Sequence, residues 1–210
     1  MRLTVFGASG GTGSNLVRQA LTAGHAVTAV VRGDHSLPVD SNLTVITANA
    51  MSPTDIETAV AGADAVLDTI GPREPGPTSV VTDAARSICT AMEATGTSRL
   101  LIVSNSARTP GPGDDPFTRY VVKPLILRPL LRHSLIDMAN AEEAVRRTRL
   151  DWTIVRAPQL TDNPRKGAYR TAIERNVTFG IRITRSDLAT CLIDLITTPD
   201  AYRAHINVAN

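Results

Sequence analysis

Aromatic residues are scarce in this chain of 210 residues. Phe, Trp and Tyr together make up only 3% of it, which leaves few rings on which single-stranded bases could stack. Neither sign of charge is in excess, because 22 Lys and Arg residues stand against 20 Asp and Glu residues and leave a formal net charge of +2. So weak an overall field does not call for a polyanionic partner. We therefore expect no nucleic acid among the partners of this protein.

Cysteine is also scarce, and metal-ligand spacings are missing. Cys89 and Cys191 lie in segments with helical apolar periodicity, where a free thiol usually behaves as a small buried hydrophobe. No Cys-x-x-Cys pair occurs, and the four histidines are scattered without a pair at ligand spacing. The sequence therefore predicts no metal site. Two cysteines used in this way favour a reducing compartment.

Long apolar runs are missing as well. No segment approaches the length that spans a membrane, and residues 3–6 already form a strand-like run, without a basic stretch followed by an apolar one. We expect a cytoplasmic protein that does not act at a membrane.

The chain does contain an alternation of short β-branched runs with longer amphipathic patterns. This alternation is typical of βαβ units and predicts a doubly wound parallel sheet with flanking helices. A hydrophobic content of 42% suits one large core, so we expect a single α/β domain over residues 1–210. The strands are expected at residues 3–6, 26–31, 43–47, 65–69, 100–103 and 153–155.

Helix signals fall between these strands. Gly24 is placed to end the first helix, Pro53 to open the second, and Ser186 to cap a last helix that Pro199 closes. Longer helices are expected over residues 80–94 and 134–147. Prolines break the pattern over residues 109–132, which we interpret as an irregular excursion packed on the sheet. The alternative for this segment is a substrate lid or an oligomer contact.

The clearest motif is the glycine-rich segment 7–13, which lies between the first strand and the first helix. Gly7 would permit the tight turn, Gly10 the approach of the backbone to a pyrophosphate, and Gly13 the close packing of helix on strand. Backbone N–H groups at the helix start would face the phosphates. The motif predicts a Rossmann fold that binds a dinucleotide through Gly7, Ser9, Gly10, Gly11, Thr12 and Gly13.

The end of the second strand indicates which dinucleotide is bound. Arg32 directly follows this strand, where the adenosine ribose lies in such folds, and a guanidinium can grip a 2′-phosphate. Asp34, which would favour a free 2′-hydroxyl, lies two residues further on. We therefore expect NADP(H) to be preferred over NAD(H).

The glycine segment, the strand end Val31-Arg32 and the run 151–158 (Asp-Trp-Thr-Ile-Val-Arg-Ala-Pro) together resemble the atypical short-chain dehydrogenase/reductases. Within that group the chain is similar to the NmrA-like proteins and to the biliverdin reductase B/flavin reductase branch. The resemblance covers nearly the whole chain, including residues 183–189. It implies cofactor contacts at Asn49 and Ala50 by the adenine, at Thr69, Ile70 and Gly71 by the nicotinamide ribose, at Ser104 by the nicotinamide and substrate, and at Ala157, Pro158, Gln159 and Leu160 over the nicotinamide.

The catalytic residues of the parent group are matched less well. Typical short-chain dehydrogenases use a tyrosine and a lysine four residues later, whereas Lys123 follows Tyr120 by three, with Pro124 next. Tyr120 and Lys123 are therefore either a shortened catalytic pair or an aromatic and a charge on a surface segment. Ser104 is the best polar candidate, although a serine without a neighbouring base is a poor proton source. The resemblance also places Asp137 and Glu142 near the pocket, where we expect them to be solvated.

Three functions fit these features. We favour an NADPH-dependent reductase that transfers hydride to a small conjugated acceptor, such as a flavin, a tetrapyrrole or a quinone, because these acceptors need little acid help. A ketoreductase for an aromatic polyketide-like ketone would draw its acid from residues 109–132. A non-catalytic NADP(H) sensor would instead bind a protein partner through the apolar and basic stretch at residues 117–132. The oligomeric state is left open.

Overall fold

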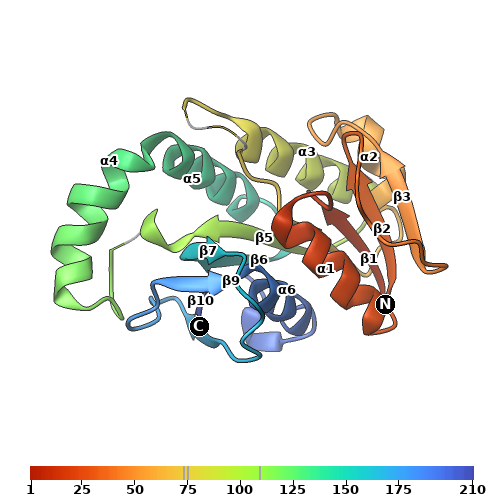
Figure 1. Cartoon of the computed structure of the whole chain (residues 1–210). Helices are drawn as coiled ribbons and strands as arrows, with labels where there is room; N and C mark the ends of the chain where they lie inside the picture. Colours follow the sequence, from red (N-terminus) through yellow and green to blue (C-terminus); the bar gives the residue numbers. More distant parts are fainter. Residues whose placement is uncertain (73, 75, 109) are drawn as a thin grey trace.

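The computed structural model describes residues 1–72, 74, 76–108 and 110–210 as a sheet flanked by helices (Figure 1). The eight strands of the main sheet lie in the order β3-β2-β1-β4-β5-β6-β10-β8. Every neighbouring pair is parallel except β10 and β8. The predicted α/β class and Rossmann fold are thus confirmed. The strands are β1 (Arg2–Phe6), β2 (Ala26–Val31), β3 (Leu43–Thr47), β4 (Ala65–Asp68), β5 (Arg99–Asn105), β6 (Asp151–Ala157), β8 (Arg170–Ile173) and β10 (Ala204–Ala209).

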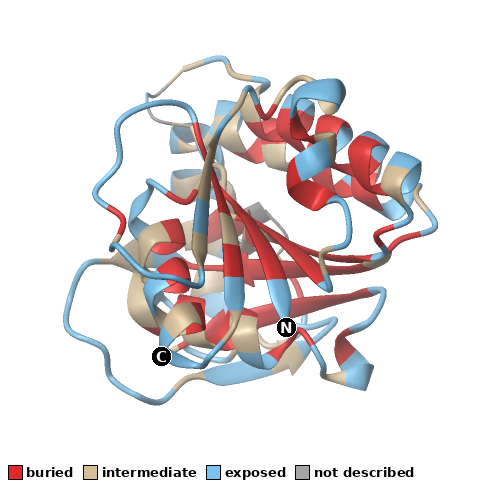
Figure 2. Ribbon diagram, turned by 90° about the vertical axis from the view of Figure 1, so that its right-hand side faces the viewer, coloured by how far each residue is buried: buried red, intermediate tan, exposed pale blue. Residues whose placement is uncertain are grey.

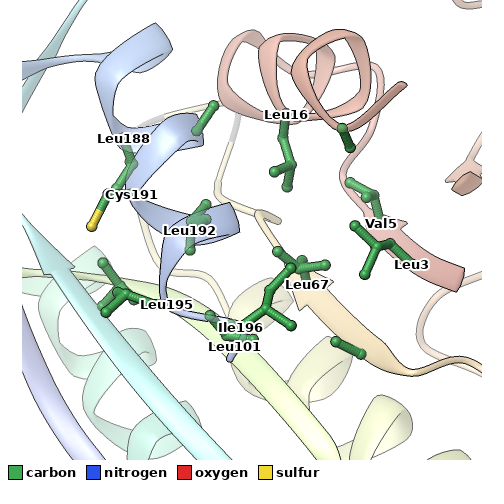
Figure 3. Packing of buried hydrophobic residues seen from close by; sticks show 14 of the residues in the cluster. Leu3, Val5, Leu16, Leu67, Leu101, Leu188, Cys191, Leu192, Leu195 and Ile196 are labelled. Carbon is green, nitrogen blue, oxygen red and sulfur yellow. The ribbon is translucent and has the colours of Figure 1, made fainter. Parts of the chain in front are cut away.

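Helices cover both faces of the sheet because side chains alternate along each strand. Leu3 and Val5 of β1 belong to the core under α1 (Gly11–Thr22) and α6 (Arg185–Asp194), where Figure 3 shows the leucines of these elements meeting. Phe6 belongs to the opposite core. That face is covered by α2 (Pro53–Val60), α3 (Val80–Thr95) and α5 (Arg132–Arg146). Figure 2 shows the buried strands between these two layers.

Six strands lie where the sequence predicts them, and two have the predicted bounds, but β8 was missed and so was β10. All six of its residues are buried, although His205 and Asn207 interrupt its apolar pattern. A second, two-stranded parallel sheet of β7 (Gln159–Thr161) and β9 (Arg182–Thr184) was missed too, because strands of three residues carry little periodicity.

The expectation of an irregular excursion over residues 109–132 is wrong for most of its length. Thr109 lies outside the described residues, but Thr118–Leu127 form a π-helix that continues through α4 (Arg128–Leu130) towards α5. Figure 1 shows this segment, residues 118–131, as an arm that extends from the body of the protein. Pro124 lies inside the wide π-turns, where the Arg128 N–H donates five residues back to the Lys123 carbonyl. Proline therefore did not end the helix as expected.

The helix ends follow the predicted signals in part. Gly24 adopts a positive φ of 81° just after α1, as expected of a helix-ending glycine. Ser186, however, is not the cap of α6, because the Thr184 hydroxyl accepts from the Asp187 N–H. Pro199 lies beyond the end of α6 and begins a short turn, Pro199–Ala201. Among the described helices, none has the length and apolar character needed to cross a membrane.

Candidate cofactor site

The glycine segment forms a tight turn at the point where the strand order reverses between β1 and β4. Gly7 has a φ of 70°, and a Cβ on it would lie 2.9 Å from the Thr69 carbonyl carbon. A Cβ on Gly13 would lie 2.2 Å from the Gly7 carbonyl oxygen. Both positions therefore need glycine, the first for its backbone conformation and the second for the close approach of α1 to the turn.

The start of α1 has no side-chain cap. Gly10 occupies the N-cap position and offers no side chain to the first-turn N–H groups. Ser9, Gly10 and Gly11 are exposed, whereas Thr12 and Gly13 are buried at the helix base. Unsatisfied N–H groups and the positive end of the helix dipole make such a terminus suited to phosphate.

The other expected cofactor residues lie on the same edge, because the carboxyl ends of parallel strands share one side of a sheet. Arg32 is exposed directly after β2. After β3, Asn49 is exposed and its side-chain oxygen accepts from the Met51 N–H, while Ala50 is buried. The Thr69 hydroxyl donates to the Phe6 carbonyl at 2.8 Å, which ties β4 to the end of β1. Ile70 is half-buried and Gly71 is exposed, and Ala157, Pro158, Gln159 and Leu160 lead from β6 into β7.

Ser104 is the last residue but one of β5, and a carboxylate lies next to its side chain. Its hydroxyl donates to Glu142 Oε1 at 2.6 Å. Arg156 of β6 grips the same carboxylate with two hydrogen bonds, Nη2 to Oε2 at 2.6 Å and Nε to Oε1 at 3.1 Å. All three residues are buried. The expectation that Glu142 is solvated is therefore wrong, and so is the premise that Ser104 lacks a neighbouring base.

A row of polar side chains continues from the buried Glu142 to the exposed Glu174 at the edge of the sheet. His205 Nε2 on β10 lies 4.0 Å from Glu142 Oε2, and its Nδ1 lies 2.9 Å from Glu174 Oε1 just after β8. Partial burial alone would raise the pKa of the Glu174 carboxyl, but hydrogen bonds from the backbone N–H and the ring of His205 hold this pKa below its usual value. Glu174 also has a φ of 55°, which is uncommon for a residue with a side chain. Sequence patterns did not reveal this row because its members come from four separate elements, β5, α5, β6 and β10, and from the residue that follows β8.

Tyr120 and Lys123 occupy different surroundings. The Tyr120 side chain is 66% exposed, with the Arg119 guanidinium 5.4 Å from its ring. Lys123 is only 5% exposed, and its Nζ contacts Asp114 Oδ1 at 2.7 Å. Asp114 also accepts from Asn176 Nδ2 at 2.9 Å. The structure therefore does not show the two as a pair on one helix face, and it places Lys123 in the contact between the arm and the loop around Asn176.

Asp137 has a structural role. Its carboxylate accepts from the N–H groups of Val81 at 3.0 Å and Thr82 at 2.9 Å, at the start of α3. The side chain is buried, so the expectation that it is solvated is wrong. A cap contributed by another helix leaves no local signal in the sequence.

Solved structures share the fold over the whole chain. A short-chain dehydrogenase/reductase from Veillonella parvula in complex with NADP superimposes with a TM-score of 0.80 at 20% identity, covering 100% of this chain and 94% of that one. A protein from Streptococcus pneumoniae, provisionally named an NADH-flavin reductase, gives a TM-score of 0.81 at 23% identity, covering 100% and 99%. At these identities the likeness shows the fold.

Sequence comparison shows the family. A 3-beta-hydroxysteroid dehydrogenase from Mycolicibacterium neoaurum is 38% identical over 68 residues, which are 32% of this chain and only 19% of that curated relative. The family model described as NAD(P)H-binding matches residues 7–199. The match runs from the glycine turn to Pro199, which lies beyond the end of α6. The chain therefore belongs to the NAD(P)H-binding family and has the fold of the short-chain dehydrogenase/reductases.

Proposed function

We propose that the protein is an NADPH-dependent reductase that transfers hydride to a small conjugated acceptor. The observation that carries this proposal is the placement of Ser104, with its buried Glu142 and Arg156 partners, on the same sheet edge as the open glycine turn. Family membership supplies the nicotinamide cofactor, which carries the redox chemistry once bound. The chain's own residues hold the cofactor and provide a hydroxyl fixed in one orientation near the reacting edge.

The nature of the acceptor follows from the surroundings of Tyr120. An exposed phenol on the arm is poorly placed to protonate a substrate oxygen beside the nicotinamide. Flavins, tetrapyrroles and quinones can take protons from water, whereas an aromatic ketone would need another acid, because the Ser104 hydroxyl donates its proton to Glu142. The name of the Streptococcus pneumoniae neighbour supports a flavin among these acceptors.

The preference for NADPH rests on Arg32. This residue is exposed at the end of β2, where its planar guanidinium can reach a 2′-phosphate. We expect Arg32→Ala to raise the dissociation constant of NADPH about tenfold or more, because a hydrogen bond to a charged group contributes roughly 1.5–3 kcal/mol. The dissociation constant of NADH should change much less. Fluorescence titration with both cofactors measures this, and equal losses would contradict the assignment.

The reductase proposal is tested by offering the pure protein NADPH and NADH with a panel of flavin, tetrapyrrole, quinone and aromatic ketone acceptors. The loss of the reduced nicotinamide is followed by its absorbance at about 340 nm. We expect oxidation with at least one acceptor and a higher kcat/KM with NADPH. Tight NADPH binding without oxidation by any acceptor would reject the reductase.

That last outcome would favour the second candidate, a non-catalytic NADP(H) sensor that binds a protein partner. The observation in its favour is the apolar surface of the arm. Four large apolar side chains are exposed there, at Tyr120, Leu125, Ile126 and Leu130, and Phe117 just before the arm is exposed as well. We also propose a cytoplasmic location, which the two free and buried cysteines support.

A further inference from the structure

The side chain of Arg185 lies across the start of α1. A Cβ on Gly11 would lie 2.6 Å from both Cδ and Nε of Arg185. Gly11 does not have a positive φ, so its backbone conformation does not require glycine. The absence of a side chain at Gly11 instead leaves room for the arginine.

Positive charge from two helix N-termini and one guanidinium meets at Arg185. Gly11 is the first residue of α1 and Arg185 is the first residue of α6, so two helix N-termini meet within the length of one arginine side chain. Each N-terminus carries the equivalent of about half a positive charge, which repels a guanidinium. The ion pair recorded for Arg185 is with Asp162, whose Oδ1 lies 3.3 Å from Nε. The Asp162 side chain is 82% exposed, so water screens its charge and it compensates the guanidinium weakly.

One nitrogen of the guanidinium has no partner of its own. Arg185 Nη1 is buried and makes no hydrogen bond within the part of the chain that the structure describes. Buried N–H groups are nearly always hydrogen-bonded in folded proteins. The Arg185 side chain as a whole is 29% exposed, so its guanidinium can turn this unpaired nitrogen towards an anionic acceptor at the α1 N-terminus.

The backbone that carries Arg185 is held firmly. The hydroxyl of Thr184 caps α6 by accepting from the Asp187 N–H at 3.0 Å. The Asp187 carboxylate in turn accepts from the N–H groups of Lys166 and Gly167, each at 3.0 Å. On the other side, Gln19 Nε2 of α1 donates to the Ser186 carbonyl at 2.9 Å and so joins the two helices. A side chain on such a support can hold a ligand without first ordering a loop.

We propose that Arg185 binds the pyrophosphate of the dinucleotide, with its guanidinium turning to donate to a phosphate oxygen while the α1 N-terminus binds the same group. The inference rests on the dinucleotide site of the proposed function and assigns its phosphates to different residues. The pyrophosphate is bound by the glycine turn, near the start of the sequence, and by Arg185, near its end. The 2′-phosphate is held by Arg32.

Two fragments of the cofactor separate these roles. ADP carries a pyrophosphate without a 2′-phosphate, and adenosine 2′-monophosphate carries the reverse. By calorimetry we expect Arg185→Gln to weaken ADP and NADPH at least tenfold and to change the affinity for adenosine 2′-monophosphate less than twofold. Arg185→Lys keeps the charge without the planar fork and should fall between. Arg182→Gln is the matched control, because it removes the same charge from an exposed position three residues earlier and should leave all three affinities unchanged.

Gly11→Ala provides a second route to the same contact. The new methyl group should displace Arg185 and weaken ADP in the wild-type background. In the Arg185→Gln background it should cost much less, since the guanidinium contact with the pyrophosphate that the methyl group disrupts is already absent. Additive losses would mean that Gly11→Ala acts on the turn alone, and would contradict the proposed contact.

The outcomes are distinguishable. If Arg185→Gln binds ADP as tightly as the wild type, or loses ADP and adenosine 2′-monophosphate equally, the inference is overturned. If the wild type binds ADP and NADPH with the expected pattern but oxidises no acceptor, the reductase fails and the role of Arg185 stands. If the wild type binds neither ADP nor NADPH, both fail. Thermal melting of each variant shows whether it is folded.

Discussion

Asp68, at the end of β4, is a carboxyl group buried beside the cofactor edge. Burial raises its pKa to about 7, although the Ile70 N–H donates to Oδ1 at 2.8 Å. In the unfolded chain the Asp68 carboxyl has a pKa near 3.8. Between pH 3.8 and about 7, the folded state therefore holds a proton on Asp68 that the unfolded state has lost. The stability contributed by the neutral form is complete below about pH 4 and is lost as the pH rises towards 7.

Asp68→Asn should remove this pH dependence, because the amide stays neutral and its oxygen can still accept from Ile70. Two pH units of differential ionisation correspond to about 3 kcal/mol. We expect the stability of the variant relative to the wild type to increase by that order between pH 5 and pH 8. Urea unfolding at both pH values measures it. A constant difference between the two proteins would show that Asp68 is ionised in the folded state at both.

Sequence patterns captured these residues unevenly. The turn roles of Gly7 and Gly13 were predicted because each follows from position along one strand, turn and helix, whereas the role of Arg32 stays a prediction. Glu142 and Arg185 were missed as partners of Ser104 and Gly11, which lie 38 residues and most of the chain length away. Long-range contacts leave no periodic signal, and a charged residue on a helix is usually solvated, so the default expectation failed at both positions.

At the scale of elements, α5 joins β5 and β6 through Glu142. Replacing this residue by glutamine leaves the Arg156 guanidinium buried without its carboxylate, and removing one member of a buried pair costs roughly 3–5 kcal/mol. We expect Glu142→Gln to lower the free energy of unfolding by that order. The neighbouring Glu143→Gln is the control, because Glu143 is exposed and its pair with Arg147 at 2.9 Å should contribute about 0.5 kcal/mol. Similar losses in both variants would mean that the buried pair adds no stability.

The elements themselves were predicted where a period is strong. The bounds of β2 and β3 agree because both are short β-branched runs between clear turn signals. The arm was not predicted, since local rules treat Pro124 and Pro129 as helix breakers. The π-turns around Pro124 and the first-turn position of Pro129 accommodate both rings. β10 was not predicted because His205 and Asn207 interrupt its apolar pattern, and His205 lies against Glu142 and Glu174, which are far away in the sequence.

The whole molecule combines a first half built on β1 to β4, which carries the glycine turn, with a second half, from β5 onward, that carries Ser104 and the arm. The arm is joined to the body through Asp114, which binds Lys123 Nζ at 2.7 Å, the Gly111 N–H at 3.0 Å and Asn176 Nδ2 at 2.9 Å. Burial lowers the pKa of Lys123, and the hydrogen bond and charge of Asp114 oppose this effect. Lys123 thus connects the arm to the segment between β8 and β9.

Lys123→Met tests whether the lysine acts on the arm or on the chemistry. If it fastens the arm, amide hydrogen exchange over residues 118–130 should become at least tenfold faster, while exchange in α1 and the dissociation constant of NADPH should stay within twofold. Tyr120→Phe, which changes an exposed residue on the same arm, should leave both exchange and turnover unchanged. If the two residues were instead a catalytic pair, both variants would lose turnover to a similar extent with exchange unaltered. Amide exchange and turnover, measured together in the two variants, therefore decide between a positioning role for Lys123 and the catalytic pair of the typical short-chain dehydrogenases.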